Sequence, residues 1–375
     1  MSNIHLQTIA SSEKFVNFFE VIGAIPDPRM DRCKKHSLAN IIAIAIFAIL
    51  GQSNTAVAIN KFGIRHKEEL ELMLDMPFGI PSRSTFSRAL NFIDPLELDF
   101  WLQYWEESLC ESVDCKHIAI DGKEDNACGF NCLRAFDVAN CRVLAHEKIA
   151  EKSNEITAAP PLLEKLNLVR VAVTADAMHT QRKTAKKIID KDGDYLLVLK
   201  GNQHQLHADV KLFFDDVERN GDLEGICSRC EIFEKSRNRF EKRMCISTGY
   251  IKWIYARNQW KGLRSISVII SSRTIGKRTI TERRYFISSL ESDAKKISAL
   301  ARAHWAIENQ CHRSLDEEFG SDRSTIRNWR AALNLSILKD FALFILKKID
   351  SGESLREKRI TNNCQFDHLI KMLYL

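Results

Sequence analysis

Hydrophobic residues in the first hundred positions recur with the spacing of α-helices. The stretch Leu38–Leu50 is dense in Ile, Ala and Leu, and Ser37 before it is a typical N-cap residue. Two further helices are predicted at Thr55–Phe62 and Thr85–Phe92. The pattern therefore predicts a small all-α domain over residues 1–114.

Short apolar runs replace the helical spacing after residue 115. His117–Asp121 is a run that ends in an acid, and only three residues separate the extended runs Leu133–Val138 and Arg142–Ile149, which predicts a hairpin. The runs Val169–Ala175 and Tyr195–Leu199 have the β-branched and apolar residues of buried strands.

Helices are predicted between the later strands. Thr157–Leu166 begins near Ser153 or Asn154, and a basic helix spans Gln181–Lys191. Three strands followed by alternating helices and strands suit an antiparallel meander joined to parallel crossovers. This order predicts an α/β domain with an RNase H-like mixed sheet.

The remaining third of the chain contains a second extended region. Residues of about 226–290 are predicted to form a β-rich insertion, and long helices are predicted at Asp293–Leu315 and Asn328–Lys348. The predicted α/β domain thus covers residues 115–350, and residues 351–375 form a C-terminal tail.

The composition, 45% hydrophobic and 28% charged, is that of an ordinary globular protein. The longest apolar stretch, Leu38–Leu50, is too short to cross a bilayer and lies too far along the chain for a signal peptide, so a cytoplasmic protein is expected. A net charge of +6 is compatible with a polyanionic partner but does not require one.

The eleven cysteines indicate reduced thiols rather than a disulfide framework. Cys227 and Cys230 form one CxxC pair, and Cys128, Cys132 and Cys141 form a loose group. No second pair stands at zinc-finger spacing, so a structural zinc site is the weaker interpretation.

Two predicted strands end in an aspartate. Asp121 closes one of them and Asp176 closes another. Because ligands of α/β sheets bind at the carboxyl ends of the strands, two adjacent strands would bring these carboxylates together, and Mg²⁺ or Mn²⁺ would relieve their repulsion. Asp176 also precedes a helix, so a simple capping role is its alternative.

A third acid cannot be selected by spacing alone. Glu308 lies beside the apolar Trp305 and Ile307, one helical turn after His304, which favours it as a metal ligand on a partly buried face. The same predicted helix offers three other acids, in a cluster typical of a solvated face: Asp316, Glu317 and Glu318.

Five short motifs occur in a fixed order along the chain. They are Asp121–Lys123, Glu147–Ile156, Thr174–Met178, Gly193–Tyr195 with Leu199–Gln203, and His304–Asn309. With Ile25–Arg29 and Gly79–Ser82, they resemble the acid-triad (DDE) transposases of bacterial insertion sequences, most closely the H-repeat-associated group linked to Rhs elements. The resemblance covers nearly the whole chain.

The resemblance implies a DNA transposase that cleaves and transfers DNA strands. It implies that Asp121, Asp176 and Glu308 hold two Mg²⁺ or Mn²⁺ ions, and that the partners are double-stranded DNA, with terminal inverted repeats and target DNA, and a second copy when DNA is bound. Residues expected near the DNA are Lys123, Lys200, Asn202, Arg239, Arg302 and His304. The helical N-terminal region is the candidate for reading the repeats.

Three departures from the family pattern leave alternatives open. Glu124–Cys128 replaces a usual Thr-Leu-Arg-Gly-Ser, Arg313 replaces an aromatic residue, and only Arg239 and Glu241 remain of a His-Gly-Arg-x-Glu block. The alternatives are a remnant that binds DNA without cleaving it, a stand-alone metal-dependent nuclease, and a zinc-dependent regulator that uses the CxxC pair.

Overall fold

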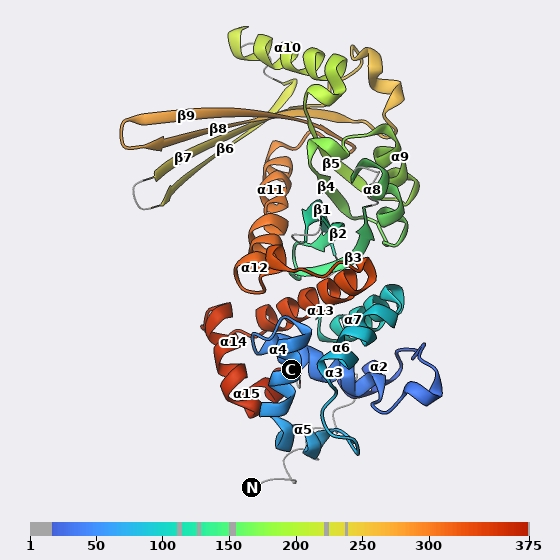
Figure 1. Cartoon of the computed structure of the whole chain (residues 1–375). Helices are drawn as coiled ribbons and strands as arrows, with labels where there is room; N and C mark the ends of the chain where they lie inside the picture. The colour runs from blue at the N-terminus through green and yellow to red at the C-terminus, as the bar shows by residue number, and fades with distance from the viewer. Residues whose placement is uncertain are drawn as a thin grey trace.

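The computed structural model describes residues 17–110, 115–125, 129–149, 155–220, 225–236 and 239–373, apart from the side chains of Cys33, Ser236 and Arg239. It consists of a helical body, which contains the first and the last of the described helices, and a large sheet flanked by helices (Figure 1). The predicted capping residues Ser153 and Asn154, and Cys128 of the loose cysteine group, lie outside the described residues.

One sheet of nine strands runs through the α/β part, in the order β3-β2-β1-β4-β5-β9-β8-β7-β6. The first five strands are β1 (His117–Glu124), β2 (Asn131–Asp137), β3 (Arg142–Lys148), β4 (Ala172–Ala175) and β5 (Asp194–Leu199). Strands β1, β2 and β3 pair antiparallel, whereas β1–β4 and β4–β5 pair parallel. The predicted RNase H-like mixed sheet is therefore confirmed.

The predicted β-rich insertion continues this same sheet. Its strands are β6 (Cys227–Ser236), β7 (Arg239–Thr248), β8 (Ser265–Ile275) and β9 (Arg278–Ser288). Strand β9 pairs antiparallel with β5, so the insertion covers what would otherwise be an open sheet edge. The far ends of β6–β9 project well beyond the helices (Figure 1), and we call these four strands the β-arm.

Helices cover both faces of the sheet. Helices α8 (Glu155–Glu164), α9 (Arg182–Asp190) and α10 (His204–Asn220) share one apolar cluster with one face. Helix α11 (Ala294–His304) packs on the opposite face against β5, β7, β8 and β9 (Figure 1). The side of the sheet that faces α11 is the one that carries the candidate site described below.

The long helix predicted over Asp293–Leu315 is interrupted. Helix α11 ends at His304, a π-helical turn η6 (Ile307–His312) follows, and α12 (Arg313–Glu317) completes the segment. A π-helical turn contains an extra residue, which shifts the side chains that follow it around the helix axis. Hydrophobic spacing does not reveal such an insertion, which is why the sequence pattern predicts one continuous helix.

Within the described residues, the helical body begins with six α-helices. They are α2 (Phe18–Gly23), α3 (Leu38–Leu50), α4 (Ala56–Arg65), α5 (Lys67–Met73), α6 (Arg83–Phe92) and α7 (Pro95–Leu109). Ser37 caps α3 as predicted, by accepting a hydrogen bond from the backbone N–H of Asn40. None of the helices in the described part of the chain is long and apolar enough to span a membrane.

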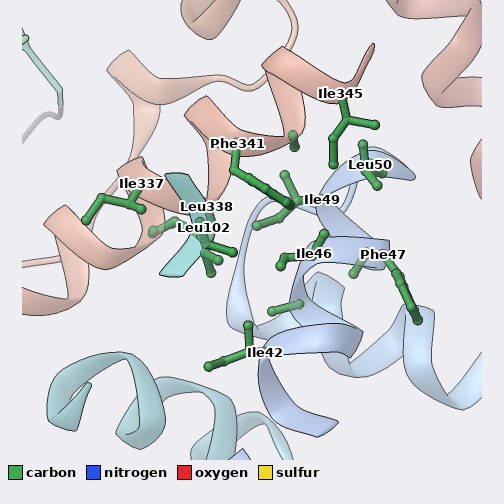
Figure 2. Close-up of a cluster of buried hydrophobic side chains, with 14 of the residues drawn as sticks. Ile42, Ile46, Phe47, Ile49, Leu50, Leu102, Ile337, Leu338, Phe341 and Ile345 are labelled. Carbon is green, nitrogen blue, oxygen red and sulfur yellow. The ribbon is translucent and has the colours of Figure 1, made fainter. Parts of the chain in front are cut away.

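The C-terminal helices complete the same apolar core. Helix α13 (Trp329–Lys348) packs against α3, α6 and α7, and α14 (Leu355–Cys364) and α15 (Phe366–Lys371) close over α3. Figure 2 shows Phe341 of α13 beside Ile49 of α3 in this core. Segments predicted as an N-terminal domain, the end of the α/β domain and a tail therefore share one core.

A buried ionic network joins the sheet to α13. Arg134 of β2 is fully buried; its Nη2 lies 2.6 Å from Oδ2 of Asp125 and its Nε lies 3.0 Å from Oδ2 of Asp340. His146 of β3 contacts the same Oδ2 of Asp340 through Nε2 at 2.8 Å, and Asp99 through Nδ1 at 3.2 Å. We call these five residues the sheet–helix network.

The sheet–helix network predicts that stability falls at alkaline pH. Burial alone would lower the pKa of His146, but Asp99 and Asp340 outweigh it and raise the pKa to about 9. A pKa raised in the folded state stabilises the protein below the unfolded value, near 6.5, and this contribution disappears as the pH rises through 9. We expect the free energy of unfolding to fall by up to about 3 kcal/mol over that range from this group.

Urea unfolding at pH 6 and pH 9, monitored by circular dichroism, measures this loss. His146→Gln is the control, because it retains every other titrating group. An equal pH dependence in the two proteins would contradict the assignment to His146.

Candidate active site

The two predicted aspartates lie side by side on neighbouring strands. Parallel pairing sets Ile120 of β1 opposite Ala175 of β4, and an aspartate follows each of them. Asp176 comes directly after β4, as predicted, whereas Asp121 lies inside β1, which continues to Glu124 instead of ending at the aspartate. Ile120 and Ala175 belong to the apolar cluster under α8 and α9, so by the two-residue alternation Asp121 and Asp176 face the opposite side, where α11 lies. Their side chains are 20% and 62% exposed.

A chain of polar side chains leads from the sheet to Asp176. Nε2 of His117 lies 2.8 Å from Oγ1 of Thr174, and the same Oγ1 lies 2.9 Å from Nδ1 of His304. Nε2 of His304 in turn lies 3.6 Å from Oδ1 of Asp176. His304 is the main cause of a lowered pKa of Asp176, with smaller contributions from Lys200 and Arg284 that act against burial.

The capping alternative for Asp176 is not supported. Asp176 occupies the N-cap position of a short 3-10 turn, η3 (Ala177–His179), but its side chain makes no capping hydrogen bond. The carboxylate instead faces His304. Asp176 is therefore oriented by the segment that contains Glu308, which lies four residues beyond His304.

Asp121 has a histidine partner from the same segment. Nδ1 of His312, in the π-helical turn, lies 3.3 Å from Oδ2 of Asp121. His312 is buried, and no hydrogen-bond partner for its Nε2 is present among the described residues. No sequence pattern indicates a role for His312, because its contact with Asp121 depends on how the π-helical turn approaches β1.

Glu155, at the start of α8, also reaches this sheet edge. A Cβ added to Gly122 would lie 2.3 Å from the carboxyl carbon of Glu155, so the absence of a side chain at Gly122 makes room for that carboxylate on the α8 side of β1, opposite the face toward which Asp121 points. Oε2 of Glu155 lies 3.2 Å from Nε2 of His179, which is buried. Glu155 belongs to the motif Glu147–Ile156, but the sequence alone does not predict its contact with β1. The signal for this contact is Gly122, where the absence of a side chain leaves room for a neighbouring group.

Glu308 lies midway between the two histidines that contact the aspartates. It is exposed at the start of the π-helical turn, and this turn packs against β1. Two of its competitors are already paired: Asp316 with Lys123 and Glu317 with Arg313. Because a π-helical turn is rare and occurs often at functional sites, its position at Glu308 favours this residue as the third acid.

Lys123 is not available for phosphate. It is 8% exposed, and its Nζ lies 2.6 Å from both carboxylate oxygens of Asp316. The expectation of a DNA contact from Lys123 is thus replaced by an internal ion pair that fixes α12 against β1. A lysine two residues after this aspartate has the same sequence signal in either role.

The other predicted DNA-contacting residues lie on both sides of Asp176. Lys200 is exposed and close enough to lower the pKa of Asp176. Nδ2 of Asn202 donates to the backbone oxygen of Ala177 at 2.7 Å, which braces the turn after Asp176. Arg302 is exposed, 3.8 Å from Glu234. Arg239 is the first residue of β7, and its side chain lies outside the described set.

The CxxC pair lies on one strand. Cys227 and Cys230 are three residues apart in β6, so their side chains point to opposite faces, and both are free thiols. This geometry disfavours a shared zinc ion and, with it, the zinc-dependent regulator.

The donor set at the sheet edge suits a hard divalent cation. Asp121 and Asp176 supply carboxylate oxygens, and neither forms a salt bridge with a lysine or arginine among the described residues. Within the same described part of the chain, no three His, Cys, Asp or Glu side chains stand close enough to hold one metal ion. The meeting of Glu308 with the two aspartates therefore stays a prediction.

Comparison with known proteins identifies two family regions. Residues 115–345 match the Transposase DDE domain, and residues 19–106 match the DDE_Tnp_1-associated family. The first region contains the sheet, the β-arm and all three predicted acids, and the second covers most of the N-terminal helices.

Full-length relatives support the same conclusion. The chain is 33% identical over 371 residues to "Putative transposase YncI" of Escherichia coli O157:H7, with 94% of each chain covered. It is 32% identical over 340 residues to "H repeat-associated putative transposase YhhI" of Escherichia coli strain K12, with 87% of this chain and 89% of the relative covered. The chain therefore belongs to the DDE transposases, in the group that includes the H-repeat-associated members.

Proposed function

We propose that this transposase cleaves DNA strands at the ends of an insertion element and transfers them to target DNA, with metal ions held by Asp121, Asp176 and Glu308. The observation that carries the proposal is the segment from His304 to His312. Its first residue contacts Asp176, its last contacts Asp121, and Glu308 lies between them. A single helical segment thus contacts both carboxylates, that of Asp121 in β1 and that of Asp176 after β4.

The side chains around the aspartates hold them in place for this chemistry. His117, Thr174 and His304 orient Asp176, and His312 orients Asp121. Two Mg²⁺ or Mn²⁺ ions bound here would activate the attacking oxygen and stabilise the leaving oxygen. Water is the first nucleophile and the freed 3′-hydroxyl the second, so no covalent intermediate with the protein is required.

The departure after Lys123 does not argue for a decayed copy. Asp125, one of the changed residues, is 6% exposed and pairs with Arg134 at 2.6 Å. A buried acid with a matched arginine indicates a coherent local structure rather than an accumulation of random changes. Residues 126–128 lie outside the described set.

The proposed partners are the terminal inverted repeats of the element, target DNA and a second copy of the chain when two ends are paired. The proposed location is the cytoplasm, at the nucleoid when DNA is bound.

A plasmid assay tests the proposal. The full-length protein is incubated with Mg²⁺ or Mn²⁺, a target plasmid and a labelled duplex with the end sequence of the element and a free 3′-hydroxyl. We expect nicked products and a labelled joined product, both absent with EDTA and with Asp121→Asn or Asp176→Asn. Equal background in all samples would support the DNA-binding remnant, and cleavage without any joined product would support the stand-alone nuclease.

A further inference from the structure

The positive charge of the chain is concentrated in the insertion. Residues 226–290 contain fifteen Lys and Arg against four Asp and Glu, a net charge of +11, whereas the whole chain carries +6. The rest of the chain therefore carries −5. The N-terminal residues 1–114 contain ten Lys and Arg against fifteen Asp and Glu, so this helical region is acidic as a whole.

Strand register places three arginines of the β-arm on one face. Arg243 lies opposite Ser271, Arg284 lies opposite Ile269, and Arg273 is two residues beyond Ser271 on the same strand. Residues directly opposite each other, or two apart on one strand, point to the same side of a sheet. This side faces α11.

A groove lies between this face and the C-terminal half of α11, and we call it the arm groove. It is lined by four arginines and a tryptophan, Arg243, Arg273, Arg284, Arg302 and Trp305, and also by two acids, Glu241 and Glu282. Arg284 and Trp305 also line a small pocket that contains Asp176 and His304. The arm groove therefore adjoins the candidate active site, and Arg273 of its lining lies farther out along the β-arm.

The arginines of the arm groove differ in how far they are already neutralised. Arg243 is 7% exposed and pairs with Glu234 at 2.5 Å. Arg302 is 56% exposed and lies 3.8 Å from the same glutamate, too far for a hydrogen bond. Arg273 is exposed and makes no ion pair within the described residues. Arg302 and Arg273 therefore have donors to offer a polyanion.

We infer that the arm groove binds the backbone of the DNA strand that enters the active site, with phosphates on Arg273 and Arg302. The inference rests on the proposed function for the identity of the polyanion. A guanidinium offers planar, paired donors that match phosphate oxygens. A second copy of the chain fits this face poorly as an occupant, since two β-arms with like charge would repel each other.

The closing experiment measures DNA binding rather than cleavage. The full-length Asp176→Asn protein, without metal, is titrated onto a fluorescein-labelled duplex at salt concentrations between about 50 and 200 mM. Arg273→Gln/Arg302→Gln is introduced into this background. The matched control is Arg323→Gln/Arg356→Gln, which removes the same charge from exposed positions outside both the arm groove and the N-terminal helices.

We expect the arm-groove variant to bind the duplex roughly tenfold or more weakly than the parent. The slope of log K against log salt concentration should become shallower by about two, because two phosphate contacts are lost. The control should stay within about twofold of the parent. Unchanged binding by the arm-groove variant, with weaker binding by the control, would overturn the inference and leave the DNA-binding function intact. An absence of binding by the parent even at the lowest salt would overturn both.

Sedimentation of the same proteins tests the alternative that a second copy of the chain, rather than DNA, occupies the arm groove. Loss of a dimer in the arm-groove variant, with unchanged DNA affinity, would assign the surface to a second copy and overturn the inference. Circular dichroism of each variant checks that the fold is retained, so a change in binding reports on the groove.

Discussion

Glu308→Gln is expected to lower metal-dependent strand cleavage at least about a thousandfold, equivalent to about 4 kcal/mol in the activation barrier. Glutamine preserves the size of the side chain but removes the charge that a divalent cation requires of its third ligand. The segment that carries Glu308 touches both aspartates through His304 and His312, so a change at position 308 acts where the two carboxylates meet.

Asp316→Asn is the matched control for this prediction. It removes one charge from the same stretch of chain, but the carboxylate of Asp316 is bound to Lys123, away from the role proposed for Glu308. We expect its cleavage rate to fall less than about tenfold. Cleavage rates on a labelled duplex, and the rise in melting temperature on addition of Mn²⁺, measure both effects. Normal cleavage by Glu308→Gln, with loss in Asp316→Asn, would transfer the third ligand to Asp316.

Sequence patterns predicted the elements whose burial is set locally. The apolar run Leu38–Leu50 behind Ser37 forms α3 with the same bounds, and the strands that contain the apolar runs before Asp121 and Asp176 pair in parallel as their order implied. These elements share one property: most residues of each apolar run are buried, so a continuous apolar stretch of helical or strand length specifies the element.

The features that sequence patterns missed depend on tertiary approach. The π-helical turn at Ile307–His312 has ordinary helical spacing on either side, so its extra residue is visible only in the backbone. The pairing of β9 with β5 joins residues about ninety positions apart, and no local pattern selects that partner.

The candidate site divides in the same way. Asp121 and Asp176 could be predicted because each directly follows a buried apolar run, and the two runs pair in parallel. The sequence did not indicate that β1 continues past Asp121 to Glu124. Glu155 and His312 could not be predicted, because their contacts arise from α8 and the π-helical turn approaching β1 from opposite sides of the sheet. Asp125, a departure from the family pattern in sequence, has a clear partner only once Arg134 is seen beside it.

Arg134, the partner of Asp125, is the residue whose loss we expect to reduce the free energy of unfolding most. Arg134→Met is expected to lower the free energy of unfolding by about 3–5 kcal/mol. Methionine fills much of the volume but leaves Asp125 and Asp340 buried without the guanidinium that both contact. Burial raises the pKa of Asp340, but the charge of Arg134 and then His146 outweigh burial and hold that pKa below its usual value. Loss of Arg134 therefore removes the largest single interaction that favours the charged form of Asp340.

Arg283→Met is the control that isolates burial. Arg283 also pairs with two carboxylates, Asp215 at 3.1 Å and Glu218 at 2.6 Å, but its side chain is 41% exposed, whereas Arg134 is fully buried. Water can solvate the two acids after Arg283 is removed, so we expect a cost below about 1 kcal/mol. Urea unfolding of both variants, with circular dichroism as the probe, gives the comparison. If the two variants lose the same free energy of unfolding, the number of ion pairs, rather than their burial, determines the contribution of the sheet–helix network. In that case apolar packing, rather than the network, holds β2 against α13.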